Sequence, residues 1–253
     1  MSPNGILLFA TVLFMVYSIL STFPMTRSVY GTEVFTKEES PFGISYNDWF
    51  SKYWNWTASL NMDEFTPKPG GCVFDNSSMV MLIDTTVQGS PQMVCDISSE
   101  QGVMIPLWIA WCDNHEKPNY TGEQLTKCAR EQYNLGNIGS EVTVDGQRVA
   151  DLDVRMSLES GKLNYKINSL DNVTEISSKG FNLTLPPDSR LLPSGTPPGT
   201  WLAGAHGWFV FLKPLPPGEH TVFYNVRVTP TGALTSPGTS PHASDVAYDL
   251  HVK

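Results

Sequence analysis

Three side chains toward the C-terminal end of the chain could together hold a metal ion: His206, Glu219 and His220. Imidazole and carboxylate groups are the ligands that copper and zinc sites use in proteins. We expect His206 and His220 to meet across neighbouring strands, with Glu219 beside them. The alternative is that these histidines are ordinary hydrogen-bonded groups on strands. Apart from this candidate metal site, the sequence predicts no cofactor.

A second polar stretch, Cys112-Asp113-Asn114-His115-Glu116, carries donors suited to calcium or another metal ion. Its spacing matches no metal-binding loop, so we interpret it as a solvated turn after a strand. The sequence contains no G-x-S-x-G nucleophile motif, no phosphate-binding glycine loop and no H-E-x-x-H zinc motif. Catalytic residues are therefore unknown at this stage.

The elements that position these groups are expected to be joined by disulfides. The chain has four cysteines, which allow three pairings: Cys72, Cys95, Cys112 and Cys128. We expect Cys72–Cys95 and Cys112–Cys128, because each closes a loop of roughly 20 residues and contributes about 3 kcal/mol in the chain-entropy model. Free buried thiols are the alternative. Disulfides form in oxidising compartments, so this pairing predicts an exported protein.

Five N-x-[ST] sequons support the same compartment, with acceptors at Asn55, Asn76, Asn119, Asn172 and Asn182. An acceptor must face solvent. Helical periodicity places Asn55 opposite an aromatic face, and strand alternation turns Asn182 away from Leu183. We therefore predict that both side chains point outward.

The N-terminal segment contains an apolar run of 18 residues, Ile6 to Phe23, and no charged side chain precedes Arg27. A secretory signal has an apolar stretch of about 7–15 residues, and a spanning helix needs about 20. We predict either a cleaved signal peptide or a single membrane anchor within residues 1–31. Any membrane contact is expected through this segment alone. The positive-inside rule argues for the reverse orientation, but the sequons and cysteines outweigh it.

Composition narrows the class of protein. The chain has 253 residues, 41% of them hydrophobic, and a net charge of −9. A basic patch is lacking, which argues against nucleic acid as a partner. Residues 32–44 are polar and without periodicity, which predicts a linker. Residues 45–253 are then long enough for a single exported domain.

Two helices are expected in this domain, at 45–60 and 121–135. Ser45 with Asp48, and Thr121 with Gln124, have the spacing of capping boxes. The first helix carries an aromatic face, which favours docking on the body over a sugar-binding platform, because so wide an exposed apolar face would be insoluble. The members of this face are Tyr46, Trp49, Phe50, Tyr53, Trp54, Trp56, Thr57 and Leu60.

The rest of the chain alternates with the period of β-strands, and Asp145-Gly146 is a hairpin signal. The segment 206–212 is apolar on both faces and should form a central strand. Pro106 has no backbone N–H to donate, so we expect its strand to lie at an edge of the sheet or to contain a bulge there. Two long loops, 185–200 and 229–244, are rich in Pro, Gly, Ser and Thr. We predict a mainly β fold: a β-sandwich, Ig-like or jelly-roll-like, with the two helices and the N-terminal apolar helix attached.

Several motifs resemble a family of exported prokaryotic proteins of unassigned activity. They are Trp49, Trp54-Asn55-Trp56, Gly71-Cys72, Cys95, Cys112, Cys128-Ala129-Arg130, Val144-Asp145-Gly146 and the turn from Leu215 to Thr221. The resemblance covers residues 45 to 228 and implies the architecture but no catalytic residue. The stretch Ser98 to Gly102 departs from it, because the relatives carry a P-A-G-type turn there.

These observations favour a cell-surface or secreted binding or structural module, or a subunit of an envelope complex, that contacts an extracellular protein or glycan. A secreted metal-dependent or glycan-active enzyme using His206 and His220 is the competing class. A carbohydrate-binding module that uses exposed tryptophans is the third.

Overall fold

The computed structural model describes residues 31–65, 74–75, 77–83, 92–132, 136–159, 162–167, 172–192, 195–229 and 242–253. The apolar run at 6–23 lies outside these ranges, so the signal or anchor helix stays a prediction. Within the described ranges, none of the helices has the length and hydropathy needed to cross a membrane. The chain divides into two compact units, Met1–Gly31 and Thr32–Lys253, and the second contains the β fold.

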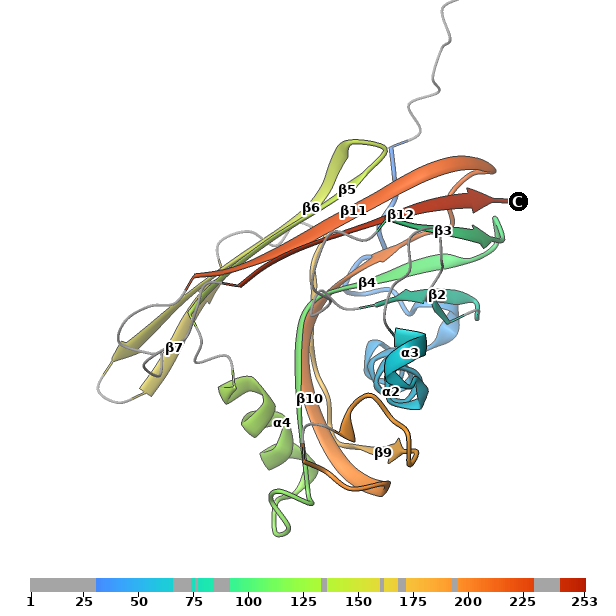
Figure 1. The fold of residues 1–253 in the computed structure, drawn as a ribbon. Helices are drawn as coiled ribbons and strands as arrows, with labels where there is room; N and C mark the ends of the chain where they lie inside the picture. The colour runs from blue at the N-terminus through green and yellow to red at the C-terminus, as the bar shows by residue number, and fades with distance from the viewer. Residues whose placement is uncertain are drawn as a thin grey trace, which may run out of the picture. The chain divides into compact units, whose positions relative to one another are not determined.

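The second unit is built on two six-stranded sheets (Figure 1). The first sheet has the order β1-β2-β4-β10-β8, with β9 also on β10: β1 (Phe74–Asp75), β2 (Met79–Leu82), β4 (Gly102–Asp113), β10 (Gly199–Leu212), β8 (Thr174–Ser177) and β9 (Phe181–Leu185). The second has the order β3-β12-β11-β5-β6-β7: β3 (Gln92–Ile97), β12 (His242–Val252), β11 (Gly218–Thr229), β5 (Asn137–Val144), β6 (Gln147–Glu159) and β7 (Lys162–Ile167). The mainly β, two-sheet prediction is confirmed.

The largest core lies between the two sheets. Alternate residues of β10 (Trp208, Val210) face alternate residues of β11 (Val222, Tyr224), which is the period of two expected for strands with one buried face. Tyr224 also binds the first sheet by a polar contact, because its hydroxyl donates to the carbonyl of Ile83. The predicted central position of 206–212 is confirmed, since this segment is buried on both faces.

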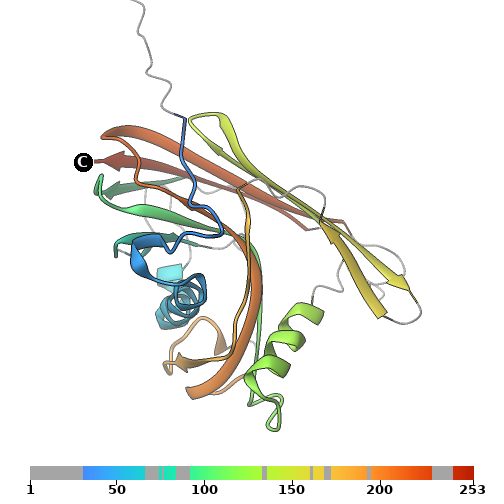
Figure 2. The same cartoon turned by 180° about the vertical axis from the view of Figure 1, so that it is seen from behind.

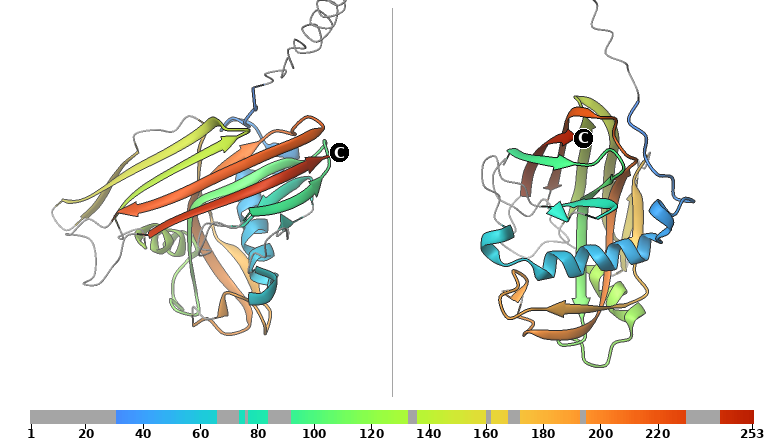
Figure 3. Two further views of the ribbon diagram at one scale, coloured as in Figure 1. Left: turned by 45° about the horizontal axis from the view of Figure 1, so that its top comes forward. Right: turned by 90° about the vertical axis from the view of Figure 1, so that its right-hand side faces the viewer.

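Helix α2 (Tyr46–Ser59) covers the opposite face of the first sheet (Figure 3, right). The Ser45 side chain accepts the Asp48 amide, so the predicted N-cap is present. Phe50 packs edge-on against Phe209, with ring centroids 5.0 Å apart. The aromatic face is therefore docked, as predicted, and its buried members are Trp49, Phe50, Tyr53, Trp54 and Thr57. A short helix, α3 (Met62–Phe65), follows.

Helix α4 (Gly122–Glu131) lies on the other side of β10 from α2 (Figure 2). Thr121 and Gln124 form the predicted capping box. The helix ends at Glu131, earlier than expected, and residues 133–135 lie outside the described ranges. It approaches β10 so closely that a Cβ on Gly204 would overlap the backbone of Leu125.

The linker expected at 32–44 instead belongs to the folded body. Val34 forms a bridge to Leu212, the Phe35 amide donates to the carbonyl of Phe211, and the Lys213 amide donates to Glu33. Backbone pairing explains the difference, because it needs no hydrophobic periodicity in the paired segment. The segment then turns through η1 (Pro41–Gly43), a short 3-10 helix, into α2.

Two local predictions concerned turns. Asp145 and Gly146 join β5 to β6 with φ of 54° and 76°, which is the two-residue hairpin that the Asp-Gly pair predicts. Pro106 lies at a register shift between Trp208 and Phe209 of the neighbouring strand, so the expected bulge is present. The edge alternative is wrong, because β4 lies between β2 and β10.

Candidate functional site

The structure does not bring the predicted metal ligands together. His206 lies on β10 in the first sheet, whereas Glu219 and His220 lie on β11 in the second. The expectation that His206 and His220 meet across neighbouring strands is therefore wrong, because the chain crosses between sheets after Leu212. Among the described residues, no cluster of three or more His, Cys, Asp or Glu side chains could hold a metal ion.

Each of these histidines instead has a carboxylate partner of its own. His206 is fully buried, and its Nε2 lies 2.9 Å from Oε1 of Glu175 on β8. This hydrogen bond is the largest cause of the lowered pKa of Glu175, and the positive charge of Arg130 adds to it. His220 Nδ1 lies 2.8 Å from Oδ2 of Asp145 in the hairpin turn. The first contact joins β10 to β8, and the second joins β11 to the turn between β5 and β6.

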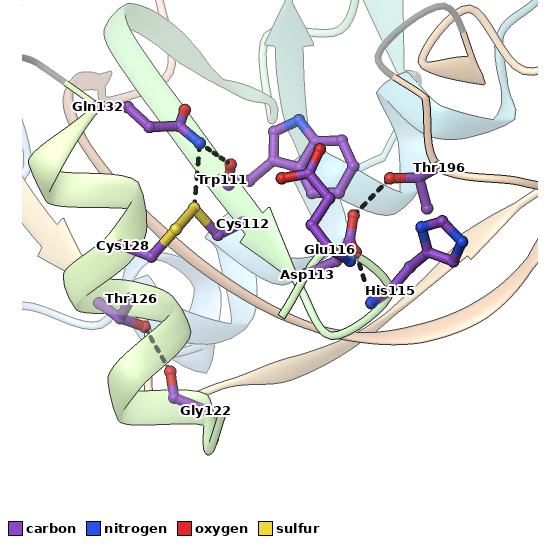
Figure 4. The surroundings of a disulfide bond; sticks show 10 residues. All are labelled: Trp111, Cys112, Asp113, His115, Glu116, Gly122, Thr126, Cys128, Gln132 and Thr196. Atoms are coloured by element: carbon purple, nitrogen blue, oxygen red, sulfur yellow. Dashed lines mark hydrogen bonds between the residues drawn. A yellow bond between two sulfur atoms is a disulfide. The ribbon is translucent and has the colours of Figure 1, made fainter. Parts of the chain in front are cut away.

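The stretch 112–116 forms the expected turn after a strand, with His115 and Glu116 exposed, but its Asp113 end belongs to β4 and is buried. This carboxylate is 1% exposed, its Oδ1 accepts the amides of His115 and Glu116, and its Oδ2 accepts the hydroxyl of Thr196 (Figure 4). A buried carboxylate needs such donors to replace its hydration. Asp113 therefore anchors the loop containing Thr196 to the end of β4.

The predicted disulfide between Cys112 and Cys128 is present beside this turn and joins β4 to α4, with Cα atoms 6.0 Å apart. Gln132 donates to the carbonyl of Trp111 and to the sulfur of Cys112 (Figure 4). Cys95 is buried on β3 and Cys72 lies outside the described residues, so the Cys72–Cys95 pairing stays a prediction. No described cysteine is a free thiol.

The sequons fall into two groups. The amide of Asn55 is bound to β9, because its Nδ2 donates to the carbonyl of Asn182 and its Oδ1 accepts the amide of Thr184, both at 3.0 Å. The prediction that Asn55 points to solvent is wrong. Asn182 has an exposed side chain, as predicted, and Asn119 is also exposed. Asn172 is also exposed and donates to the carbonyl of Val149, and Asn76 lies outside the described residues.

The strongest candidate for binding is an open pocket of about 740 Å³ where the end of β3, the turn into β4 and η1 meet. Its lining combines an aromatic ring with charged, amide and hydroxyl groups: Phe42, Ser78, Asp96, Ile97, Ser98, Glu100, Gln101 and Lys253. A concave site with a few convergent polar groups is the usual form of a small-ligand site. We call it the Phe42 pocket.

Phe42 is the aromatic side chain of this pocket and has an unusual backbone. Its φ is 55° and ψ is 30°, in the left-handed region that costs a non-glycine residue about 1–2 kcal/mol. The side chain is 39% exposed. Apart from Tyr120, it is the one large hydrophobic side chain in the described ranges that is exposed. Strain of this kind persists where the surrounding structure or a function maintains it.

The polar wall is held by the turn between β3 and β4. The Gln101 side chain accepts the Ser98 amide and donates to the carbonyl of Ser77, so it ties the turn to the start of β2. Lys253 lies 2.7 Å from Asp96, and together with His251 it holds the pKa of Asp96 below its usual value. Asp96 is thus charged at neutral pH and paired with Lys253, and both Asp96 and Glu100 are exposed.

Sequence reasoning missed this pocket. The Pro-Phe-Gly turn at 41–43 is the one signal that could have marked Phe42, because Pro and Gly flank a residue in a turn. Asp96 and Lys253 come together through the parallel pairing of β3 with β12, which alternation alone does not reveal. The tryptophans proposed as an exposed sugar platform are not exposed, since all seven are buried or partly buried.

Comparisons with known proteins give no family. No family model matches the chain, and no curated protein matches it. Among solved structures the chain is similar to CfaE, the adhesive subunit of the CFA/I fimbria of enterotoxigenic Escherichia coli. The match has 11% identity, a TM-score of 0.17, and covers 48% of this chain and 37% of that chain. A mutant of the same adhesin matches at 12% identity and a TM-score of 0.16, over 57% and 35%. These low scores carry no inference about fold or function.

Proposed function

We propose that this chain is an exported cell-surface module that binds an extracellular ligand in the Phe42 pocket. The observation that carries the proposal is the exposed, strained Phe42 ring beside the Asp96–Lys253 pair. Backbone strain at an exposed aromatic residue is typical of functional sites, where the side chain must occupy a defined position. The two-sheet body behind it presents the pocket on a rigid support, which favours recognition.

Export is supported by the bond between Cys112 and Cys128, because disulfides persist in oxidising compartments. The exposed acceptors Asn119 and Asn182 are compatible with glycosylation outside the cell. The apolar run at 6–23 supplies the signal or anchor that export requires. The partner is therefore a protein or glycan of the envelope or the surroundings of the cell.

Labelling of intact cells with a membrane-impermeant amine reagent tests the export step. Lys127 on α4 has a side chain that is 75% exposed and makes only a long pair with Glu131. We expect Lys127 to be modified in intact cells as fully as in lysed cells. Modification of Lys127 only after lysis would overturn export.

Retention on a washed envelope fraction from the source cells tests the binding step. We expect the full chain to be retained, and Phe42→Gly to remove retention, because glycine keeps the turn and deletes the ring. The matched control is Tyr120→Ala, which removes the other exposed aromatic side chain at a turn outside the pocket. Equal retention of the Phe42 variant and the wild type would refute a role for this pocket.

A further inference from the structure

The lining of the Phe42 pocket restricts the chemistry of its ligand. The lining contains one aromatic ring, that of Phe42, together with several oxygen- and nitrogen-bearing side chains. The hydroxyls of Ser78 and Ser98 can each donate and accept a hydrogen bond. A ligand that fills this pocket must therefore have one apolar surface and several hydroxyl-like groups around it.

Charged side chains of both signs line the pocket. Asp96 and Glu100 repel an anion, and Lys253 repels a cation. Asp96 already has two partners, since Lys253 Nζ lies 2.7 Å from its carboxylate and His251 Nδ1 lies 3.3 Å from it. A neutral ligand meets no such repulsion, and the same groups can bind it by charge-assisted hydrogen bonds.

The Phe42 ring is fixed before any ligand arrives. It packs edge-on against Phe35, with centroids 5.8 Å apart, and a Cβ on Gly102 would lie 3.1 Å from its Cε2. Phe35 and the backbone at Gly102 therefore restrict the movement of this lining ring. A pre-positioned aromatic surface lowers the cost of ordering on binding.

From these observations we infer that the Phe42 pocket binds a neutral sugar unit, an inference that rests on the proposed function. The C–H face of a pyranose ring is weakly positive and suits the negative face of an aromatic ring. Its hydroxyl groups suit the serine, carboxylate and ammonium groups around that ring. The extracellular ligand of the module is therefore a saccharide.

The test uses the full chain and saturation-transfer NMR with the methyl glycosides of glucose, galactose, mannose and N-acetylglucosamine. At least one should bind with a Kd of about 1 mM or tighter. Binding should weaken by about tenfold or more in Phe42→Gly, remain in Phe42→Trp, and remain in Tyr120→Ala. The unfolding midpoint of Phe42→Gly shows whether this variant is folded. If it is not folded, the binding measured for Phe42→Trp still tests the role of the aromatic ring.

A charge control separates a sugar from an ion. Binding of a neutral sugar should be independent of added NaCl, and Glu100→Gln should change it by less than about threefold, because the amide still forms hydrogen bonds. Tetramethylammonium and inorganic phosphate serve as the ionic probes. The inference would be overturned if either ion bound at Phe42 and none of the glycosides did. It would also be overturned if none of the four glycosides gave a saturation-transfer signal. If the envelope fraction still retains the chain in that case, the proposed function stands and only the sugar is wrong.

Discussion

The side-chain amide of Asn55 on α2 forms hydrogen bonds with the backbone of β9 at Thr184, as the backbone of a neighbouring strand would. The Asn55 amide accepts the Thr184 backbone N–H and donates to the carbonyl of Asn182, and these are groups that β9 would offer to a further strand. An open edge is a template for pairing with another chain, and side chains or covering elements that block it prevent aggregation. Asn55 therefore closes this edge of the first sheet.

The first prediction concerns this contact. Asn55→Ala should lower the free energy of unfolding by about 1–3 kcal/mol. It removes the two hydrogen bonds to β9 and a third to the carbonyl of Ser51, and it leaves these backbone groups of β9 unpaired. Asn182→Ala is the matched control, since only its backbone takes part and its side chain is exposed. Denaturant titration of both variants measures the difference. Equal unfolding midpoints for the two variants would contradict the role of the Asn55 side chain.

The second prediction concerns the sequons. N-glycosylation replaces one N–H of the side-chain amide. Asn55 already donates from its amide nitrogen to the carbonyls of Ser51 and Asn182, whereas the exposed Asn172 makes one such bond. Asn119 and Asn182 are exposed. In protein from its own cells we expect glycopeptides at Asn119 and Asn182 and an unmodified peptide at Asn55. A glycan on Asn55 together with an unmodified Asn119 would contradict the prediction. It would show that the Asn55 side chain is not bound to β9 when the glycan is attached.

The sequence predicts those parts of the fold that depend on local patterns. The caps at Ser45 and Thr121, the Asp145-Gly146 turn and the buried helix face all depend on neighbours in the chain. Contacts between segments that are distant in the sequence do not follow from such local patterns. Helical periodicity gives the face on which Asn55 lies, but not that β9 passes beside that face.

The same reason explains the candidate site. His206 and His220 are close in sequence, and alternation cannot tell whether consecutive strands share a sheet or cross to the opposite one. Asp96 and Lys253 are far apart in sequence and meet because β3 pairs in parallel with β12. The left-handed backbone of Phe42 belongs to a single turn residue and carries no periodic signal.

The third prediction concerns the disulfide. Replacing Cys112 and Cys128 by alanine should destabilise the protein by about 3 kcal/mol, because the bond closes a loop with a sequence separation of 16. Gln132→Ala removes only the hydrogen bonds beside it and should cost about 1 kcal/mol. Thermal unfolding measures both. A double variant as stable as the wild type would show that packing alone holds α4.

The fourth prediction concerns pH. The hydrogen bond from His206 lowers the pKa of Glu175, so the folded state favours the carboxylate. That contribution is complete above the unfolded pKa, near 4.5, and is lost as pH falls through the lower folded pKa. Glu175→Gln should therefore reduce stability at pH 7 by about 1 kcal/mol, since one-third of the side chain is exposed, and flatten the loss below pH 4.5. Unfolding at a series of pH values gives both curves, and parallel curves would contradict the assignment.

The last prediction concerns the approach of α4 to the first sheet. A methyl group on Gly204 of β10 would overlap the backbone of Leu125 and Thr126. The helix cannot easily move away, because the Cys112–Cys128 disulfide ties α4 to β4, the strand next to β10. Gly204→Ala should therefore cost about 1–3 kcal/mol or more. Gly139→Ala on β5 is the matched control, since nothing lies within 4 Å of its added methyl. Alanine there should leave stability unchanged or raise it slightly, because it restricts the unfolded chain. If the two alanine variants unfold at the same denaturant concentration, α4 does not pack on β10 in solution as it does here.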